Sequence, residues 1–309
     1  MNLSRNNFRC GVLLLAGITA LAALSGCGRS KTAAAVDDGR LRVAVSILPQ
    51  VDIVGSIGGD AVQIELMVGP GDSPERYEPS TARLRALRDT ALYLSIGVPF
   101  ETTWLPRFAA MNPGMRVVDT IAGIDRMPML DGHAHHGGHP AARHDDQVDP
   151  HVWLSPALVR RQAVVITEAL VSARPGRAAY FRERMDAFAQ RLDELDKELR
   201  EILADLPSRR FIVFHPAWGY FARDYDLEMI PVERGGQEPS AAELAAVLDI
   251  ARRDNIRVIF TQPEVSSASA RVIAGQIDGR VVEISPLAGD LDGNLKRVAR
   301  AIAAAVNDG

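Results

Sequence analysis

Residues 178–206 read AAYFRERMDAFAQRLDELDKELREILADL, and this stretch decides how the rest of the chain can be arranged. Its apolar residues recur at alternating steps of four and three, from Phe181 to Ile202, and charged residues fill the gaps. This period places the apolar residues on one face of a single amphipathic α-helix. We expect the helix to begin after Arg174-Pro175-Gly176 and to end before Pro207. Its length would be on the order of 43 Å, enough to span two lobes.

The same spacing would also suit a coiled-coil seam with a second chain. A single helix isolated between two halves of a chain more often packs on its own protein. We therefore expect this helix to link two lobes of one monomer.

Short runs rich in Val, Ile and Leu lie on both sides of the helix and alternate with helical patterns. They are residues 41–46, 62–68, 91–97 and 115–120 before it, and 210–215, 227–232, 256–262 and 281–285 after it. Runs that are apolar on both faces and separated by helices are typical of parallel strands covered on both sides. The sequence predicts an α/β fold of two lobes, each with a four-stranded, mainly parallel sheet flanked by helices, joined by one long rigid helix. The predicted boundaries are 40–173 for the N-terminal lobe, 174–207 for the linking helix and 208–309 for the C-terminal lobe.

The start of the chain has the pattern of a secretory signal. Arg5 and Arg9 precede an uncharged apolar stretch that is too short to span a bilayer comfortably. The tetrad Leu24-Ser25-Gly26-Cys27 that follows resembles the lipobox of bacterial lipoproteins. We expect residues 1–26 to be a cleaved signal peptide, Cys27 to carry the lipid that anchors the protein to a bacterial membrane, and residues 27–39 to be a flexible tether. An ordinary secretory signal with an incidental cysteine is the alternative.

Charge and cysteine content exclude a nucleic-acid partner and a disulfide. Residues 1–26 contain two arginines and no acidic residue, so their removal would change the formal net charge from −4 to −6. Such a chain offers no basic surface for nucleic acid. Cys10 lies in the segment to be removed, which leaves Cys27 without a partner in the mature chain.

Residues 131–147, DGHAHHGGHPAARHDDQ, hold five of the seven histidines. The segment has no apolar periodicity, so we expect a disordered surface loop. Histidine tracts of this kind bind zinc, copper or nickel loosely, which suggests a weak auxiliary site that collects metal. Its histidines are His133, His135, His136, His139 and His144.

The other two histidines both stand where ligands gather in α/β proteins. His215 closes the predicted strand 210–215, and the carboxyl ends of such strands are the usual place for ligands. His151 lies in DPHVWLSP, where prolines on both sides restrict the backbone and Pro156 can open the next helix.

Three segments resemble the motif series of a known family. They are PERYEPS (74–80), DPHVWLSP (149–156) and FHPAWGY (214–220). The series P-H-x-Y-E-P, D-P-H-x-W-x-x-P and F-H-x-A-x-x-Y is that of the cluster A-I solute-binding lipoproteins, which deliver zinc or manganese to ABC importers. The resemblance covers essentially the whole mature chain, and it implies a metal site in a cleft between two α/β lobes.

The resemblance also implies one metal ligand from each motif, commonly three histidines and a carboxylate in all. His151 and His215 carry over directly, whereas the first histidine corresponds to Glu75 and the carboxylate to Ser285. Because Glu75 adds a negative charge and Ser285 removes one, the total charge of the ligand set is unchanged. Glu264, which follows a predicted strand, is an alternative extra ligand.

Two imidazoles and a carboxylate suit zinc, with a water, the serine hydroxyl or a bidentate carboxylate completing the shell. Mn(II) and Fe(II) accept the same set, but the histidine-rich segment favours zinc. We expect Asp149 to orient His151 through the other ring nitrogen.

The implied function is capture of zinc outside the cytoplasmic membrane and its delivery to an ABC permease in that membrane. A zinc-dependent hydrolase is one alternative, because two histidines, a glutamate and an open position also occur in such enzymes. The chain has no HExxH-type spacing and no evident general base, so we expect no enzymatic activity. A family member that has lost its metal and serves as an adhesin or structural lipoprotein is the other alternative.

Overall fold

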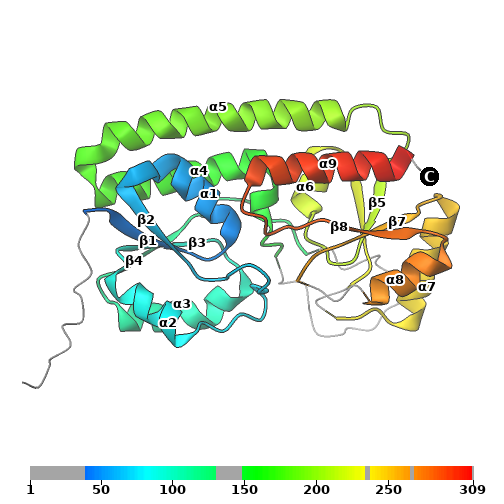
Figure 1. Cartoon of the computed structure of the whole chain (residues 1–309), viewed down its shortest axis with the longest axis horizontal. Coiled ribbons are helices and arrows are strands. Elements are labelled where there is room, and N and C mark those ends of the chain that lie inside the picture. The colour runs from blue at the N-terminus through cyan, green and yellow to red at the C-terminus, as the bar shows by residue number, and fades with distance from the viewer. Residues whose placement is uncertain (1–38, 130–147, 234–236, 265–267, 308–309) are drawn as a thin grey trace, which may run out of the picture. The chain divides into compact units, whose positions relative to one another are not determined.

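Two parallel β-sheets organise the chain, as the computed structural model in Figure 1 shows. The structure describes residues 39–129, 148–233, 237–264 and 268–307. The predicted signal peptide, Cys27 and the histidine-rich segment 131–147 lie outside these residues. Within the described ranges, no helix is both long enough and apolar enough to cross a membrane.

The first sheet has the strand order β2-β1-β3-β4, and all of its pairs are parallel. The inner strands β1 and β3 are almost wholly buried, as expected for runs that are apolar on both faces. The strands are β1 (Leu41–Val45), β2 (Val62–Leu66), β3 (Leu92–Ser95) and β4 (Arg116–Asp119). The helices of this part are α1 (Leu48–Gly58), α2 (Thr81–Ala86), α3 (Pro99–Met111) and α4 (Pro156–Ala173).

The second sheet repeats this topology with the order β6-β5-β7-β8, again all parallel. Every predicted run therefore overlaps an observed strand, and the predicted α/β fold with two four-stranded sheets is confirmed. The strands are β5 (Arg210–Val213), β6 (Glu228–Pro231), β7 (Val258–Thr261) and β8 (Arg280–Glu283). The helices are α6 (Gly219–Asp224), α7 (Ala241–Arg253), α8 (Ala268–Gln276) and α9 (Leu291–Asn307).

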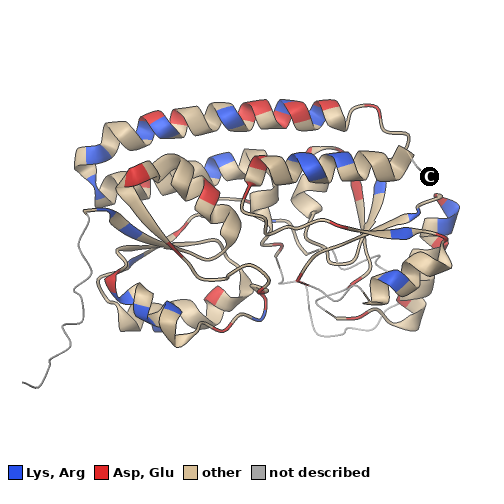
Figure 2. Cartoon of the chain, in the orientation of Figure 1, with Lys and Arg blue, Asp and Glu red and all other residues tan. Residues whose placement is uncertain are grey.

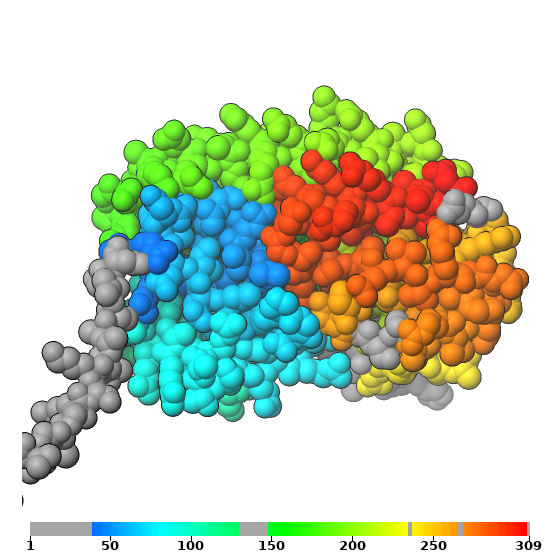
Figure 3. Space-filling model, viewed as in Figure 1, coloured from blue at the N-terminus to red at the C-terminus, as the bar shows by residue number. Residues whose placement is uncertain are grey.

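The long helix α5 (Ala178–Ile202) lies between the two sheets in the sequence and packs against α1, α4 and α9. Figure 2 shows acidic and basic residues along it, and Figure 3 shows it beside the red α9. The helix ends earlier than the predicted 206. Arg209 explains this end, because its guanidinium donates to the carbonyl oxygens of Leu203 and Ala204 at 2.9 and 2.8 Å and so satisfies them outside a helix.

Arg191 of α5 connects helices from both halves of the chain. Its Nη2 lies 2.7 Å from Asp52 Oδ2 in α1 and 3.0 Å from Asp292 Oδ1 in α9. Asp52 also accepts the Leu291 N–H at the start of α9, at 3.3 Å. The groups are partly buried, so this network is screened less than a surface ion pair. It fastens α5 to both halves on the side of α1 and α9.

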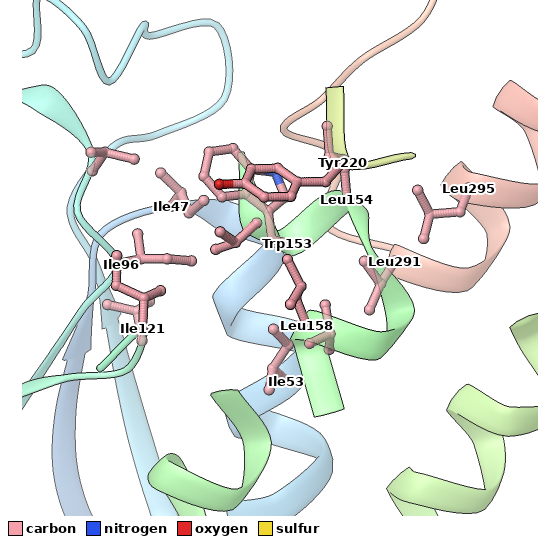
Figure 4. Packing of buried hydrophobic residues seen from close by; sticks show 14 of the residues in the cluster. Ile47, Ile53, Ile96, Ile121, Trp153, Leu154, Leu158, Tyr220, Leu291 and Leu295 are labelled. Carbon is pink, nitrogen blue, oxygen red and sulfur yellow. The ribbon is translucent and has the colours of Figure 1, made fainter. Parts of the chain in front are cut away.

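The main hydrophobic cluster draws on both sheets. It contains Val43 of β1, Leu94 of β3, Phe211 of β5 and Phe260 of β7. Figure 4 shows Trp153 among side chains from different helices, Ile53 from α1, Leu158 from α4 and Leu291 from α9. Residues 39–309 accordingly form one compact unit. The lobe boundaries given above stay a prediction.

The apolar face of α5 should contribute strongly to stability. The Leu195 side chain is 1% exposed, so Leu195→Ala would leave a cavity and is expected to lower the free energy of unfolding by about 2–4 kcal/mol. Chemical denaturation of the metal-free protein would measure this, with the exposed neighbour Glu194→Ala as the control. Equal stability of the two variants would contradict the packing of α5 described here.

Candidate metal centre

His215 and Glu233 meet because they follow neighbouring parallel strands. β5 ends at Val213 and β6 at Pro231, and each of the two residues stands two positions beyond its strand. His215 was expected to close its strand, and it instead lies just past the end. His215 Nδ1 is 3.0 Å from Glu233 Oε2, and both side chains are largely buried. The pairing fixes the imidazole ring at the carboxyl edge of the second sheet.

His151 is held by the carboxylate that the sequence predicts. Asp149 Oδ1 accepts the His151 backbone N–H at 2.9 Å and lies 2.7 Å from His151 Nδ1. Asp149 is 2% exposed, so this arrangement is shielded from water. The contact confirms the expectation for Asp149, and it leaves Nε2 as the ring nitrogen available to a metal.

The segment that carries His151 is tied to the second half of the chain. Tyr220 of α6 donates its hydroxyl proton to the Asp149 carbonyl oxygen at 2.9 Å. Trp153 Nε1 donates to the Pro286 carbonyl oxygen at 2.7 Å, and Ser155 is bonded to Asp224. His151 therefore precedes α4 in the sequence but is fixed against elements of the second sheet.

Glu75 reaches the two histidines from the loop between β2 and α2. The loop is held by a hydrogen bond from Phe100 N to the Pro74 carbonyl oxygen at 3.2 Å and by the edge of Tyr77 against Phe100. Glu75 Oε1 lies 3.0 Å from His215 Nε2. The ring centroids of His151 and His215 are 5.5 Å apart. The structure thus brings together the three side chains that the motifs singled out.

These side chains line a very small cavity. Its volume is about 10 Å³, roughly the space that one water molecule needs. A single ion fits such a space, and an organic molecule does not. The lining residues are Ser73, Pro74, Glu75, His151, His215, Gln262, Glu264, Pro286 and Leu287.

The donors do not yet stand in the geometry of a bound metal. In the part of the chain that the structure describes, no group of three or more His, Cys, Asp or Glu side chains is placed to hold an ion. Two zinc ligands in a tetrahedral site lie about 3.4 Å apart, whereas Glu75 and His215 are hydrogen-bonded at 3.0 Å. An ion could enter only if these two side chains separated.

The charges of the pair follow from its surroundings. Burial by itself would lower the pKa of His215, but the hydrogen bonds with Glu233 and Glu75 outweigh it and raise the pKa to about 9. The hydrogen bond from His215 lowers the pKa of Glu75, against the opposing effect of burial. Near neutral pH the centre therefore holds an imidazolium between two carboxylates, and a metal ion would take the place of its proton.

The two candidates for a further ligand are placed differently. Glu264 lines the small cavity, and burial raises its pKa. Ser285 does not line the small cavity. It lines a neighbouring cavity, to which Glu264 also contributes, and its Oγ accepts the Leu287 N–H at 3.2 Å. The histidine-rich segment 131–147 and Cys27 lie outside the described residues.

Glu233, whose carboxylate holds the His215 ring, was not singled out by the sequence analysis. It directly follows the buried run of β6, and β6 pairs with β5, which leads to His215. An acidic residue just past a buried strand was a usable signal. Which strand would lie next to β5, however, could not be read from the sequence.

Comparisons with known proteins show which family the chain belongs to. The family model described as "Zinc-uptake complex component A periplasmic", ZnuA, matches residues 43–305. The chain is 28% identical to the "High-affinity zinc uptake system protein ZnuA" of Bacillus subtilis over 272 residues, which cover 86% of this chain and 85% of that protein. This chain is also 28% identical to the "Zinc-binding lipoprotein AdcA" of Streptococcus pneumoniae, and the match covers 89% of this chain. The match covers only about half of AdcA, 54% of its length.

Solved structures show the same fold. A crystal structure of a ZnuA mutant that lacks residues 138–173 and has zinc bound superposes with a TM-score of 0.79 at 39% identity. The match covers 86% of this chain and 98% of that one. From the family match over residues 43–305 and this likeness to a zinc-bound relative, the chain belongs to the ZnuA family of periplasmic zinc-uptake components.

Proposed function

We propose that this chain binds a divalent transition metal, zinc above all, outside the cytoplasmic membrane and passes it to an ABC-type permease. The observation that carries the proposal is the way both histidines are held. In each histidine, Nδ1 lies within hydrogen-bonding distance of a carboxylate, that of Asp149 for His151 and that of Glu233 for His215. Nε2 is therefore the nitrogen that each ring can offer to a metal. Metal-binding histidines are almost always oriented in this way.

In this proposal Glu75, His151 and His215 supply two nitrogen ligands and one anionic oxygen, a set that suits zinc. Manganese and iron(II) also accept nitrogen and carboxylate oxygen. The relatives named for zinc and the zinc-bound structural neighbour support zinc as the cargo. The ion enters as Glu75 parts from His215 and the imidazolium gives up its proton.

Delivery would depend on the β2–α2 loop. Glu75 is the one proposed ligand on that loop, whereas His151 and His215 are both anchored to the second half of the chain. The Arg191 network and α5 hold the two halves together on another side of the molecule. We therefore propose that loading and release proceed by displacement of the Glu75 loop, with the protein tethered to the membrane through a lipid on Cys27.

Binding is a better account of the site than hydrolysis. Members of this family are solute-binding proteins. A hydrolytic zinc site must admit a substrate beside the metal-bound water. The cavity at the two histidines measures about 10 Å³, so it offers room for the ion alone.

The test is the metal content of the protein after chelation and reloading with a mixture of zinc, manganese and iron(II). We expect one tightly held zinc per chain, in the protein lacking residues 131–147 as well as in the protein that retains them. Extra, weakly held zinc in the latter would belong to the histidine-rich segment. A protein that retains no stoichiometric metal in either form would refute the proposed function.

A further inference from the structure

We infer that Glu264, and not Ser285, is the fourth protein ligand to the metal. The loaded site would then have two histidine and two glutamate ligands. This inference rests on the proposed function. It assigns the position that the family pattern leaves open in this chain.

An unsatisfied oxygen is the first argument. Glu264 Oε2 is buried and has no hydrogen-bond partner among the described residues. A buried carboxylate oxygen without a partner costs free energy that is recovered only when a proton donor or a cation binds it. A metal ion in the cavity that Glu264 lines would be such a partner.

The position of Glu264 in the fold is the second argument. β7 ends at Thr261 and pairs with β5, so Glu264 and His215 follow neighbouring parallel strands. They meet at the carboxyl edge of the sheet, with Glu75 across the cavity. Glu264 also lines a larger, polar cavity of about 490 Å³, whose other charged residues are Asp72, Arg76, Glu78 and Arg83. Glu264 thus stands between the inner site and an outer polar space.

Ser285 is engaged elsewhere. Its hydroxyl oxygen accepts the Leu287 N–H, and its carbonyl oxygen accepts from Asn294 Nδ2 at 2.7 Å. The next carbonyl, of Pro286, accepts from Trp153. These three bonds fix the segment in a turn, and Ser285 is not among the residues that line the small cavity.

The assignment also fixes the chemistry of the ligand set. Glu75 and Glu264 would supply two anionic oxygens beside the two imidazole nitrogens. The added oxygen also makes the set harder, so manganese and iron(II) should compete better than at a site with three histidines.

Three variants test the assignment, each made with and without residues 131–147. Glu264→Gln removes the ligand, Ser285→Ala removes the alternative, and Glu283→Gln removes the same charge from an exposed position at the end of β8. Zinc affinity is measured by competition with a chromophoric chelator, and the visible spectrum of the Co²⁺-loaded protein reports the ligand set. We expect Glu264→Gln to weaken zinc binding by roughly 100-fold and to change the Co²⁺ spectrum, while the other two variants behave as wild type.

Thermal melting of the metal-free proteins separates a ligand from a structural residue. Because Glu264 Oε2 has no partner to lose, Glu264→Gln should melt no lower than wild type. Wild-type affinity and spectrum in Glu264→Gln would overturn the assignment, and so would a loss in Ser285→Ala. If the wild type binds zinc and only these variant results fail, the proposed function stands without the inference. If the wild type binds none, both fall.

Discussion

Replacement of Glu75 by alanine is expected to abolish retention of zinc at the site, with a loss of affinity of roughly 1000-fold or more. Glu75 is the one proposed ligand that reaches the centre from the β2–α2 loop, and it lies 3.0 Å from His215 Nε2. Its loss would remove an anionic ligand and open the cavity on that side. The measurement is zinc per chain after dialysis against a chelator of graded strength, in the protein lacking residues 131–147.

Glu78→Ala is the matched control, since it removes the same charge from an exposed position three residues further along the loop. Glu75→His restores the histidine that the family commonly has, and it should retain zinc because an imidazole can take the same place. Unchanged zinc retention in Glu75→Ala would show that ERYEPS has no part in the site. Equal losses in Glu75→Ala and Glu78→Ala would indicate a general effect of charge.

The architecture could be predicted because its signals are local. Strands such as Leu92–Ser95 are apolar on both faces, and the apolar residues of α5 keep a helical period over its whole length. The position at which α5 ends was harder to predict. The helix stops at Ile202 because Arg209, in the segment that follows it, binds the carbonyl groups of Leu203 and Ala204. A contact of that kind leaves no mark in the periodicity.

The site was predictable only where a motif fixes it. Glu75, His151 and His215 come together as the motif resemblance implies. The role of Glu233 could not be predicted, because its contact with His215 depends on which strands are neighbours in the sheet. The choice between Glu264 and Ser285 depends on where side chains point after a strand ends, which the sequence does not show. The Ser285 hydroxyl is engaged within its own loop, where it accepts the Leu287 N–H.

Zinc affinity should depend steeply on pH, because the metal must displace a proton from His215. The two glutamates raise the pKa of His215 to about 9 despite its burial. Below that pH each bound zinc releases one proton from this residue, so affinity should fall about tenfold per pH unit. Between pH 8 and pH 6 the loss should reach roughly 100-fold. The lowered pKa of Glu75 keeps it ionised throughout this range, so it adds nothing to the slope.

Calorimetric titration with zinc in buffers of different ionisation enthalpy counts the released protons directly. Glu233→Gln is the informative variant. Without the second carboxylate the pKa of His215 should fall, and the bend in the plot of affinity against pH should move to lower pH. An affinity that is constant between pH 6 and pH 8, or binding without proton release, would show that His215 does not bind the metal as proposed.

The stability of the metal-free protein should change with pH in the opposite direction. The folded-state pKa of His215 lies above the value of 6.5 for an unperturbed histidine. Its protonation therefore stabilises the fold fully below about pH 6.5, and this contribution, on the order of 3 kcal/mol, is lost as the pH rises through 9. Melting of the metal-free protein should accordingly occur at lower temperature at pH 9.5 than at pH 7, while added zinc should reverse the trend. Glu75→Ala and Glu233→Gln should each reduce this dependence, because each removes one of the two carboxylates that hold the proton on His215 in the absence of metal.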